Sequence, residues 1–285
     1  MMKKILCYSC IFWSTQGISF CNSLDIWNGF MYHNNSTPQY AIALETLKEV
    51  SFNQIDKILD IGCGSGDISA NLIAPLVPQG HVLGIDMSGN MIEFARQAYK
   101  NIPNVNFDIV DVRDWIPAHK EYDCAVSFNV FHWIKDLRPV FVNVAQCLKP
   151  EGIFLFAMGY KNNFFTDSTA AVASSSKWAK YLKNPIRHAN LTHDKESIKE
   201  ILEYAGFKPL VIKKFNQKIN LASEEKFALF TRAWIYAIPE LKEIPEDLCE
   251  DYINDIIKNS PINYNEDGSI YFFTSILIVK AVKLA

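Results

Sequence analysis

A glycine-rich segment, ILDIGCGSGDIS at residues 58–69, constrains the fold of this chain more than any other feature. Gly62, Gly64 and Gly66 stand at alternate positions directly after a short apolar run that contains Asp60. A glycine turn that follows a buried strand lets a nucleotide-like ligand approach the bare backbone, because no Cβ atom fills that space. The segment therefore predicts a strand, a ligand-binding turn and a helix, in that order.

Strand-like and helix-like segments alternate along the rest of the chain. Strands are expected at 56–62, 81–86, 105–111, 122–129 and 152–159, and helices at 39–50, 65–77, 88–100 and 137–148. Further on we expect a helix at 194–207, a strand at 209–216, helices at 223–238 and 245–259, and a last strand at 268–283. Such alternation is typical of βαβ units. It predicts an α/β fold: a doubly wound, mostly parallel sheet of about seven strands, with an antiparallel last strand and helices on both faces.

The length of 285 residues suits one large domain, which we expect to cover residues 24–285. Within it, 161–190 and 223–260 are expected to cover the substrate. Residues 1–23 are expected to be an N-terminal extension. Their basic start and short apolar stretch resemble an export signal. An export signal and a start codon placed too far upstream therefore remain alternatives for this segment.

The amino-acid composition limits the classes of binding partner that we expect for this protein. Lys and Arg total 28 against 31 Asp and Glu, which gives a net charge of −3 without a basic block. Nucleic acid is therefore not expected as the main partner, nor is a membrane, which leaves a small-molecule substrate. The odd number of cysteines, seven, suits reduced thiols and a cytoplasmic location. Cys7 and Cys10 have CxxC spacing, but without a second pair no metal site is expected. The oligomeric state is left open.

The glycine turn departs from the dinucleotide-binding fingerprint. In G-x-G-x-x-G the third glycine would fall at position 67, which is occupied by Asp67. A carboxylate there would repel a pyrophosphate, so a ligand without phosphate is expected. S-adenosylmethionine (SAM) fits this requirement. Its amino acid tail and ribose could approach Gly62, Gly64 and Gly66, and its ammonium group suits an acid such as Asp60.

Three polar residues stand at the ends of the next expected strands. Asp86 ends the second, where an acid accepts hydrogen bonds from ribose hydroxyls; Asp111 ends the third and could accept one from the adenine amino group; Asn129 ends the fourth. Because the carboxyl ends of parallel strands meet at one edge, these residues should line one crevice. Asp86 or Asp111 alone could equally be a helix cap, so the ordered set carries the prediction of SAM binding.

The set ILDIGCGSGDIS, GIDMSGNMIEFAR, DIVDVRDW, YDCAVSFNVFHWIKD and CLKPEGIFLF, spread over residues 39–160, resembles the successive motifs of class I SAM-dependent methyltransferases. The resemblance implies a Rossmann-like methyltransferase fold. It also implies that the methionine part of SAM lies at Gly62, Cys63 and Gly64. It implies further that the ribose lies at Asp86 with Met87 against the adenine, and that the adenine lies at Asp111 and Val112.

NVFHWIKD resembles the carboxyl methyltransferases that act on trans-aconitate, on juvenile hormone acid and on a malonyl thioester. YHNNSTPQYAIALETL resembles the Tyr-x-x-x-Ser/Asn-x-x-Gln opening helix of the juvenile hormone acid group. That resemblance implies that Gln39 and Trp133 flank a substrate carboxylate. A carboxylate is ionised at neutral pH and needs alignment rather than a base, so we expect methyl-ester formation on a small or lipid-like carboxylic acid. His132 is an alternative base, which leaves an amine, phenol or ring-carbon acceptor open. A SAM-binding protein that has lost catalysis is the remaining alternative.

Overall fold

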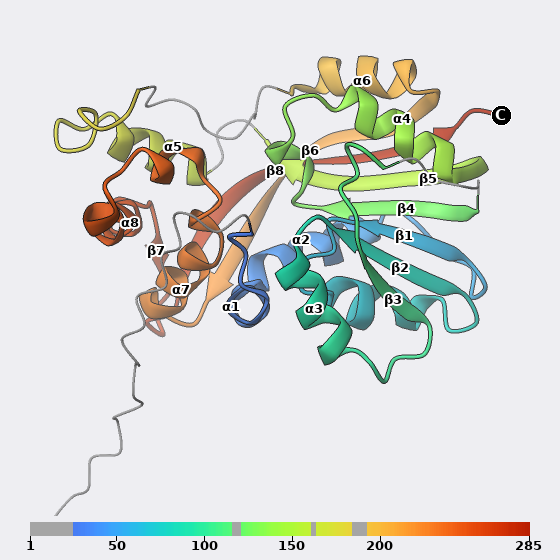
Figure 1. The fold of residues 1–285 in the computed structure, drawn as a ribbon, viewed down its shortest axis with the longest axis horizontal. Coiled ribbons are helices and arrows are strands. Elements are labelled where there is room, and N and C mark those ends of the chain that lie inside the picture. The colour runs from blue at the N-terminus through green and yellow to red at the C-terminus, as the bar shows by residue number, and fades with distance from the viewer. Residues whose placement is uncertain (1–24, 116–120, 161–163, 184–192) are drawn as a thin grey trace, which may run out of the picture.

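The computed structural model describes residues 25–115, 121–160, 164–183 and 193–285, and within them a twisted sheet of eight strands forms the centre (Figure 1). The strands are β1 (Lys57–Ile61), β2 (His81–Asp86), β3 (Val105–Ile109), β4 (Tyr122–Phe128), β5 (Leu148–Gly159), β6 (Phe207–Leu221), β7 (Asn263–Tyr264) and β8 (Ile270–Lys283). Their order is β3-β2-β1-β4-β5-β8-β6, and the short β7 pairs with β8.

The strand directions confirm the predicted fold class. The pairs β1–β2, β1–β4, β2–β3 and β4–β5 are parallel. The last strand, β8, runs antiparallel to both β5 and β6. The sheet differs from the prediction in two details, the additional two-residue β7 and the greater length of β6.

Helices cover both faces of the sheet. They are α1 (Gly29–Asn35), α2 (Thr37–Leu47), α3 (Gly89–Ala98), α4 (Arg138–Cys147), α5 (Phe164–Ala173), α6 (Lys195–Tyr204), α7 (Glu224–Ile235) and α8 (Cys249–Lys258). Figure 1 shows α4 and α6 on one side of the sheet and α2 and α3 on the other. Each face has its own apolar core against these helices. Within the described ranges, no helix is long and apolar enough to cross a membrane.

Local sequence signals account for several helix ends. The Ser88 hydroxyl accepts a hydrogen bond from the Met91 N–H at 3.1 Å and so caps α3. The Asp194 carboxylate accepts one from the Ser197 N–H at 2.9 Å and caps α6. That helix ends before Gly206, which has a φ of +86°. These ends agree with the predicted helices at 88–100 and 194–207.

Other segments depart from the predictions. The helix expected at 65–77 contains a π-helical turn, Ser69–Ile73, followed by a 3₁₀ turn, Ala74–Leu76. Two helices were not predicted, α1 and α5, and the second of these lies in a stretch without a visible apolar period. Residues 1–24, with Cys7, Cys10 and Cys21, lie outside the described residues. The other four cysteines are free and buried.

A third apolar core lies beyond the carboxyl ends of the parallel strands. Gly159, the last residue of β5, pairs with Ile276 of β8, so residues 270–275 extend past the carboxyl end of β5. The matching part of β6 extends with them. The core joins this overhang to α5, α7 and α8, and its buried aromatic residues include Phe227 of α7, Tyr252 of α8 and Trp178, which follows α5. The expected substrate-covering segments contain these helices and the turns that follow α5 and α7, whereas 161–163 and 184–190 lie outside the described residues.

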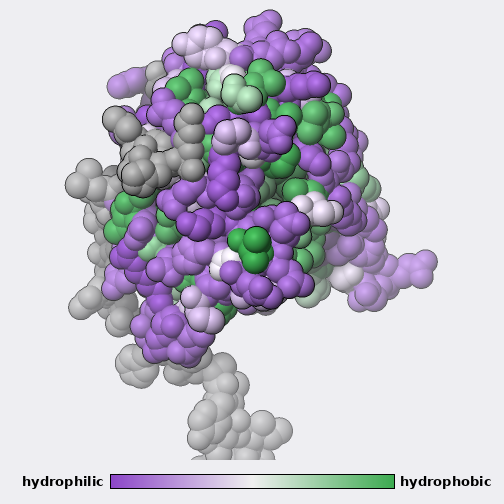
Figure 2. Space-filling model, turned by 90° about the vertical axis from the view of Figure 1, so that its right-hand side faces the viewer, coloured by the Kyte–Doolittle hydropathy of each residue, from purple (hydrophilic) through white to green (hydrophobic). Residues whose placement is uncertain are grey.

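The amino ends of the parallel strands, on the opposite side of the sheet, form a solvated surface. Exposed ion pairs join Lys57 to Glu121 at 3.2 Å and Lys149 to Asp123 at 2.6 Å, near the amino ends of β1, β4 and β5. Figure 2 looks at the molecule from the right-hand side of Figure 1, and hydrophilic residues dominate that face, with scattered hydrophobic ones. The carboxyl edge, under the overhang, is the place for a ligand, as in open α/β sheets generally.

The glycine turn gives the first prediction. A Cβ at Gly66 would lie 2.7 Å from Phe107 Cζ and 2.9 Å from Ala95 Cβ, whereas a Cβ at Gly268 meets nothing within 4 Å. Both glycines have a φ of +82°, so alanine at either site carries the same left-handed backbone cost of about 1–2 kcal/mol. Overpacking adds about 1–3 kcal/mol. Gly66→Ala should therefore lower the urea-unfolding free energy by that much more than Gly268→Ala. Equal losses would show that Gly66 is needed for its backbone conformation alone.

Candidate active site

A cavity of about 250 Å³ opens at the carboxyl ends of β1, β2 and β4, and most of the predicted site residues lie in its wall. These are Gln39, Gly62, Gly64, Asp86, Met87, Asp111, Val112, Asn129, His132 and Trp133. Three predicted cofactor residues, Asp60, Cys63 and Gly66, are not among the residues that line it. The cavity therefore joins the predicted cofactor residues to the predicted acceptor residues in one space.

The glycine turn after β1 is fixed to the end of β2. The N–H groups of Gly62 and Cys63 both donate to the Ile85 carbonyl, at 2.7 and 3.0 Å. Gly62 has a φ of +70°, and a Cβ there would lie 2.2 Å from Val130 Cγ2. The backbone of this turn can therefore reach the cavity only with glycine at position 62.

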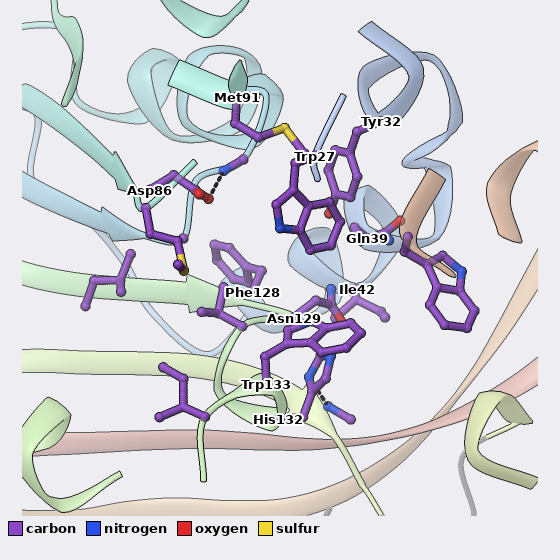
Figure 3. Close-up of a pocket in the computed structure, with 18 of the residues that line it drawn as sticks. Trp27, Tyr32, Gln39, Ile42, Asp86, Met91, Phe128, Asn129, His132 and Trp133 are labelled. Atoms are coloured by element: carbon purple, nitrogen blue, oxygen red, sulfur yellow. Dashed lines mark hydrogen bonds between the residues drawn. The ribbon is translucent and has the colours of Figure 1, made fainter. Parts of the chain in front are cut away.

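Asp86 ties the same turn to the start of α3. One carboxylate oxygen accepts a hydrogen bond from the Gly64 N–H at 3.0 Å (Figure 3), and the other accepts one from the Ser88 N–H at 2.9 Å. Burial raises the pKa of Asp86, and these backbone hydrogen bonds partly oppose that rise. These hydrogen bonds fix the Asp86 carboxylate in the cavity wall and also hold the glycine turn in place.

The three predicted residues outside the wall have structural surroundings. The Asp60 carboxylate accepts a hydrogen bond from the Ser69 hydroxyl at 2.5 Å, and burial raises its pKa to about 7. Cys63 is buried, and Gly66 makes room for Phe107 against α3. The prediction that these residues bind the cofactor directly gains no support from their positions. Asp67, whose carboxylate was expected to repel a pyrophosphate, also lies outside the wall. Its carboxylate accepts a hydrogen bond from the Tyr99 hydroxyl at 3.1 Å.

Asp111 and Asn129 complete the cofactor end. The Arg113 guanidinium donates to the Asp111 carboxylate, with 2.8 Å between Nε and Oδ1, and this pairing lowers the pKa of that carboxyl. Asn129 has a φ of +62°, a left-handed conformation that Asn tolerates better than most residues. Its side-chain Nδ2 is buried without a hydrogen-bond partner in the described part of the chain. A buried amide that lines a cavity with an unsatisfied donor is a group that a ligand can satisfy.

The acceptor end is built from elements far apart in the chain. Gln39 comes from the first turn of α2, and His132 and Trp133 come from a 3₁₀ turn, Phe131–Trp133, that follows β4. The overhanging core adds Thr169, Phe230, Trp234, Ile238, Phe272 and Thr274 to the wall. Gln39 Oε1 is buried without a hydrogen-bond partner among the described residues. An amide can present either end after a rotation of its plane, so Gln39 is available to a ligand.

His132 is held in one tautomer. Its Nδ1 accepts a hydrogen bond from the Gly159 backbone N–H at 3.2 Å (Figure 3). Burial lowers the pKa of His132 to about 4, so the ring is neutral at physiological pH. A neutral ring whose Nδ1 accepts carries its proton on Nε2. His132 therefore presents a donor to its surroundings and has no free basic nitrogen.

Several wall residues were not predicted. Trp27 and Tyr32 stand before α2, and their rings meet at right angles with 5.8 Å between centroids. Tyr32 begins the Tyr-x-x-x-Ser-x-x-Gln stretch that ends at Gln39, so the sequence held a signal for it. Trp27 lies outside any motif. Phe230 falls in the segment 223–260 that was expected to cover the substrate, although it was not singled out. Phe272 reaches the cavity from the part of β8 that extends past β5, which no local pattern reveals.

Comparisons with known proteins place the chain in a family. The family model described as "Methyltransferase domain" matches residues 53–206, more than half of the chain. Juvenile hormone acid O-methyltransferase of Bombyx mori is 26% identical over 280 residues, covering 90% of this chain and 98% of that protein. Trans-aconitate 2-methyltransferase of Escherichia coli is 30% identical over 132 residues, covering 46% and 50%. The chain thus spans about half the length of some curated relatives and nearly all of the silkworm enzyme.

A solved structure gives the same fold. Phosphoethanolamine N-methyltransferase 2 of Haemonchus contortus, in complex with SAM, has a TM-score of 0.55 at 20% identity, covering 90% of this chain and 56% of that one. At this identity the likeness concerns the fold alone. The sheet order, the glycine turn and the family match together show that this chain belongs to the SAM-dependent methyltransferases.

The wall residues suit SAM, the cofactor of this family. Bare backbone at Gly62 and Gly64, the Asp86 carboxylate and the unsatisfied Asn129 amide all face one cavity. Asp86 and Asp111, the positions predicted for the ribose and the adenine, both line this cavity. Within the described ranges, no group of three or more His, Cys, Asp or Glu residues could hold a metal ion.

Asp86 gives the second prediction. Asp86→Ala should weaken SAM binding by about 1.5–3 kcal/mol, the range for hydrogen bonds to a charged group, measured by titration calorimetry. The same variant also loses the bonds to Gly64 and Ser88, so its urea-unfolding free energy should fall as well. Asp108→Ala is the control, since that carboxylate is paired with Arg96 at the surface, outside the cavity. Unchanged SAM affinity in a folded Asp86→Ala variant would restrict Asp86 to a structural role.

Proposed function

We propose that this enzyme transfers the methyl group of SAM to the carboxylate of a small or lipid-like carboxylic acid. The observation that carries the proposal is the hydrogen bond from the Gly159 N–H to His132 Nδ1, in a ring whose pKa is lowered by burial. Amines and phenols are mostly protonated at neutral pH and need a base to become nucleophiles. A carboxylate needs none, and the side chain best placed to be a base is a donor here.

The acceptor end offers neutral hydrogen-bond donors for a carboxylate. The Gln39 amide, the His132 Nε2–H and the Trp133 indole N–H all belong to wall residues. Among the described wall residues the charged side chains are Asp86, Asp111 and Arg113, and the last two are paired with each other. A carboxylate held at the acceptor end therefore has the sulfonium of SAM as its opposite charge.

The shape of the acceptor end favours an acid with an apolar body. Its wall is formed largely by Ile42, Phe230, Trp234, Ile238 and Phe272. Burial of a hydrocarbon against such a surface stabilises a complex by about 25 cal/mol per Å². The names of the two relatives described above, which refer to a juvenile hormone acid and to trans-aconitate, support an acid acceptor as well.

The protein's role in this reaction is to align the acceptor carboxylate with the methyl group of SAM. When bound, SAM supplies an electrophilic methyl group on a sulfonium ion, and its transfer to a carboxylate oxygen gives a neutral ester and neutral S-adenosylhomocysteine (SAH). Donors at Gln39 and Trp133 hold one carboxylate oxygen and leave the other free to attack. The aromatic wall excludes water, which strengthens the interactions inside. No proton changes place in this scheme.

The third prediction is a pH profile. At saturating SAM and acid, kcat should be flat from about pH 6 to 9, because a carboxylic acid is ionised throughout that range and His132, with a pKa of about 4, stays neutral. The measurement is the initial rate of SAH formation in buffers of constant ionic strength. A rate that rises with an apparent pKa between 6 and 9 would contradict the carboxylate proposal and favour an amine or phenol acceptor.

The fourth prediction ranks three substitutions. Gln39→Ala and Trp133→Phe should each lower kcat by about 10-fold or more, because each removes a donor that aligns the acceptor, while SAM affinity stays near the wild-type value. His132→Ala should lower kcat less, since no base is required. Tyr204→Phe, on the exposed face of α6, is the control that should match the wild type. If His132→Ala is the most damaging of the three, the assignment of acceptor alignment to Gln39 and Trp133 is wrong.

A further inference from the structure

A short N-terminal strap, residues 25–28, is bound to the start of α3. The Asp25 carboxylate accepts hydrogen bonds from the Ser88 hydroxyl and from the Asn90 N–H, each at 2.9 Å. In return, the Asn90 side-chain amide donates to the Trp27 carbonyl at 3.1 Å. The strap is thereby fixed to the turn that directly follows β2, next to the predicted ribose site.

The strap continues into α1 without slack. The Asn28 side chain accepts a hydrogen bond from the Met31 N–H at 2.9 Å and caps that helix. At Gly29 an added Cβ would lie 2.6 Å from Phe94 Cβ of α3, so the two helices approach as closely as glycine allows. The backbone of Trp27 is therefore fixed on both sides, by the bonds of Asp25 and Asn90 before α1 and by the capped start of α1 itself.

The Trp27 ring lies between the two ends of the cavity. It meets Tyr32 at 5.8 Å and Trp133 at 6.3 Å between centroids, and both pairs are nearly perpendicular. Tyr32 borders the glycine turn, where its Cε1 would lie 3.4 Å from a Cβ on Gly64. Trp133 belongs to the acceptor end. Figure 3 shows Trp27 in this central place, with Tyr32 and Trp133 on either side.

We propose that Trp27 recognises the positive charge of the SAM sulfonium and that Asp25 is the residue that positions it. The reacting methyl group must lie where the cofactor end meets the acceptor end, and Trp27 borders that junction. The faces of an indole ring attract cations, more strongly when water is excluded. SAH carries no such charge, so this contact separates the cofactor from its product. The proposal rests on SAM as cofactor and not on the carboxylate acceptor.

The test compares two ligands in the absence of any acceptor. Full-length wild type and Trp27→Leu are titrated with SAM and with SAH by calorimetry. Loss of apolar packing weakens both ligands alike and cancels in the ratio of the two affinities. A lost cation–π contact should lower the SAM-to-SAH affinity ratio by about 3- to 30-fold. An unchanged ratio in the folded variant would overturn the proposal, whatever the acceptor is.

Three further variants separate positioning from packing. Asp25→Ala should lower the same ratio, because the strap loses its bonds to Ser88 and Asn90. Asp25→Asn keeps one carbonyl acceptor and should recover part of the loss. Phe30→Leu is the matched control: this aromatic residue of α1 is 66% exposed and does not line the cavity. A ratio that falls equally in Phe30→Leu, or that stays unchanged in Asp25→Ala, would exclude the proposed role of Asp25.

Discussion

The site depends on one backbone connection, the attachment of the glycine turn after β1 to the end of β2. The Ile85 carbonyl accepts two N–H groups of the turn and the Asp86 carboxylate accepts a third, from Gly64. Asp86 also accepts the Ser88 N–H, and the Ser88 hydroxyl in turn donates to Asp25. Residues 85–88 thus fix the glycine turn, the start of α3 and the strap that carries Trp27.

The arrangement of the strands brings the cofactor end and the acceptor end together in one cavity. The carboxyl ends of β1, β2, β3 and β4 supply the predicted polar cofactor residues, because these parallel strands end on the same side of the sheet. The antiparallel β8 begins beyond that edge and places Phe272 and Thr274 opposite them. The apolar core on the overhang then closes the acceptor end with α5 and α7. The overhang thus supplies the apolar part of the proposed acceptor end, whereas His132 and Trp133 come from the turn that follows β4, close to the predicted cofactor residue Asn129.

Sequence patterns predicted β1, β2 and β4 because these strands are short, mostly buried and bounded by turns. The length of β6 was underestimated, since much of that strand is not buried. They also located Asp86, Asp111 and Asn129, because strand ends define the site in this architecture. They did not separate Gly62 from Gly66, since both are glycines of one turn, and only the packing of Phe107 shows what Gly66 does. Trp27 could not be predicted at all. Its place depends on hydrogen bonds between segments 63 or more positions apart.

The proposed reaction uses an acceptor that is already negatively charged when it enters the site. The most direct measurement uses SAM labelled with tritium in its methyl group, the enzyme, and a filtered extract of small molecules from the native host. Methyl esters release methanol in mild alkali, whereas N-methyl, aryl ether and C-methyl groups do not. We predict that most of the enzyme-dependent label becomes volatile methanol after alkali treatment. Label that remains in the non-volatile fraction would contradict a carboxylate acceptor and leave the amine, phenol or ring-carbon alternatives.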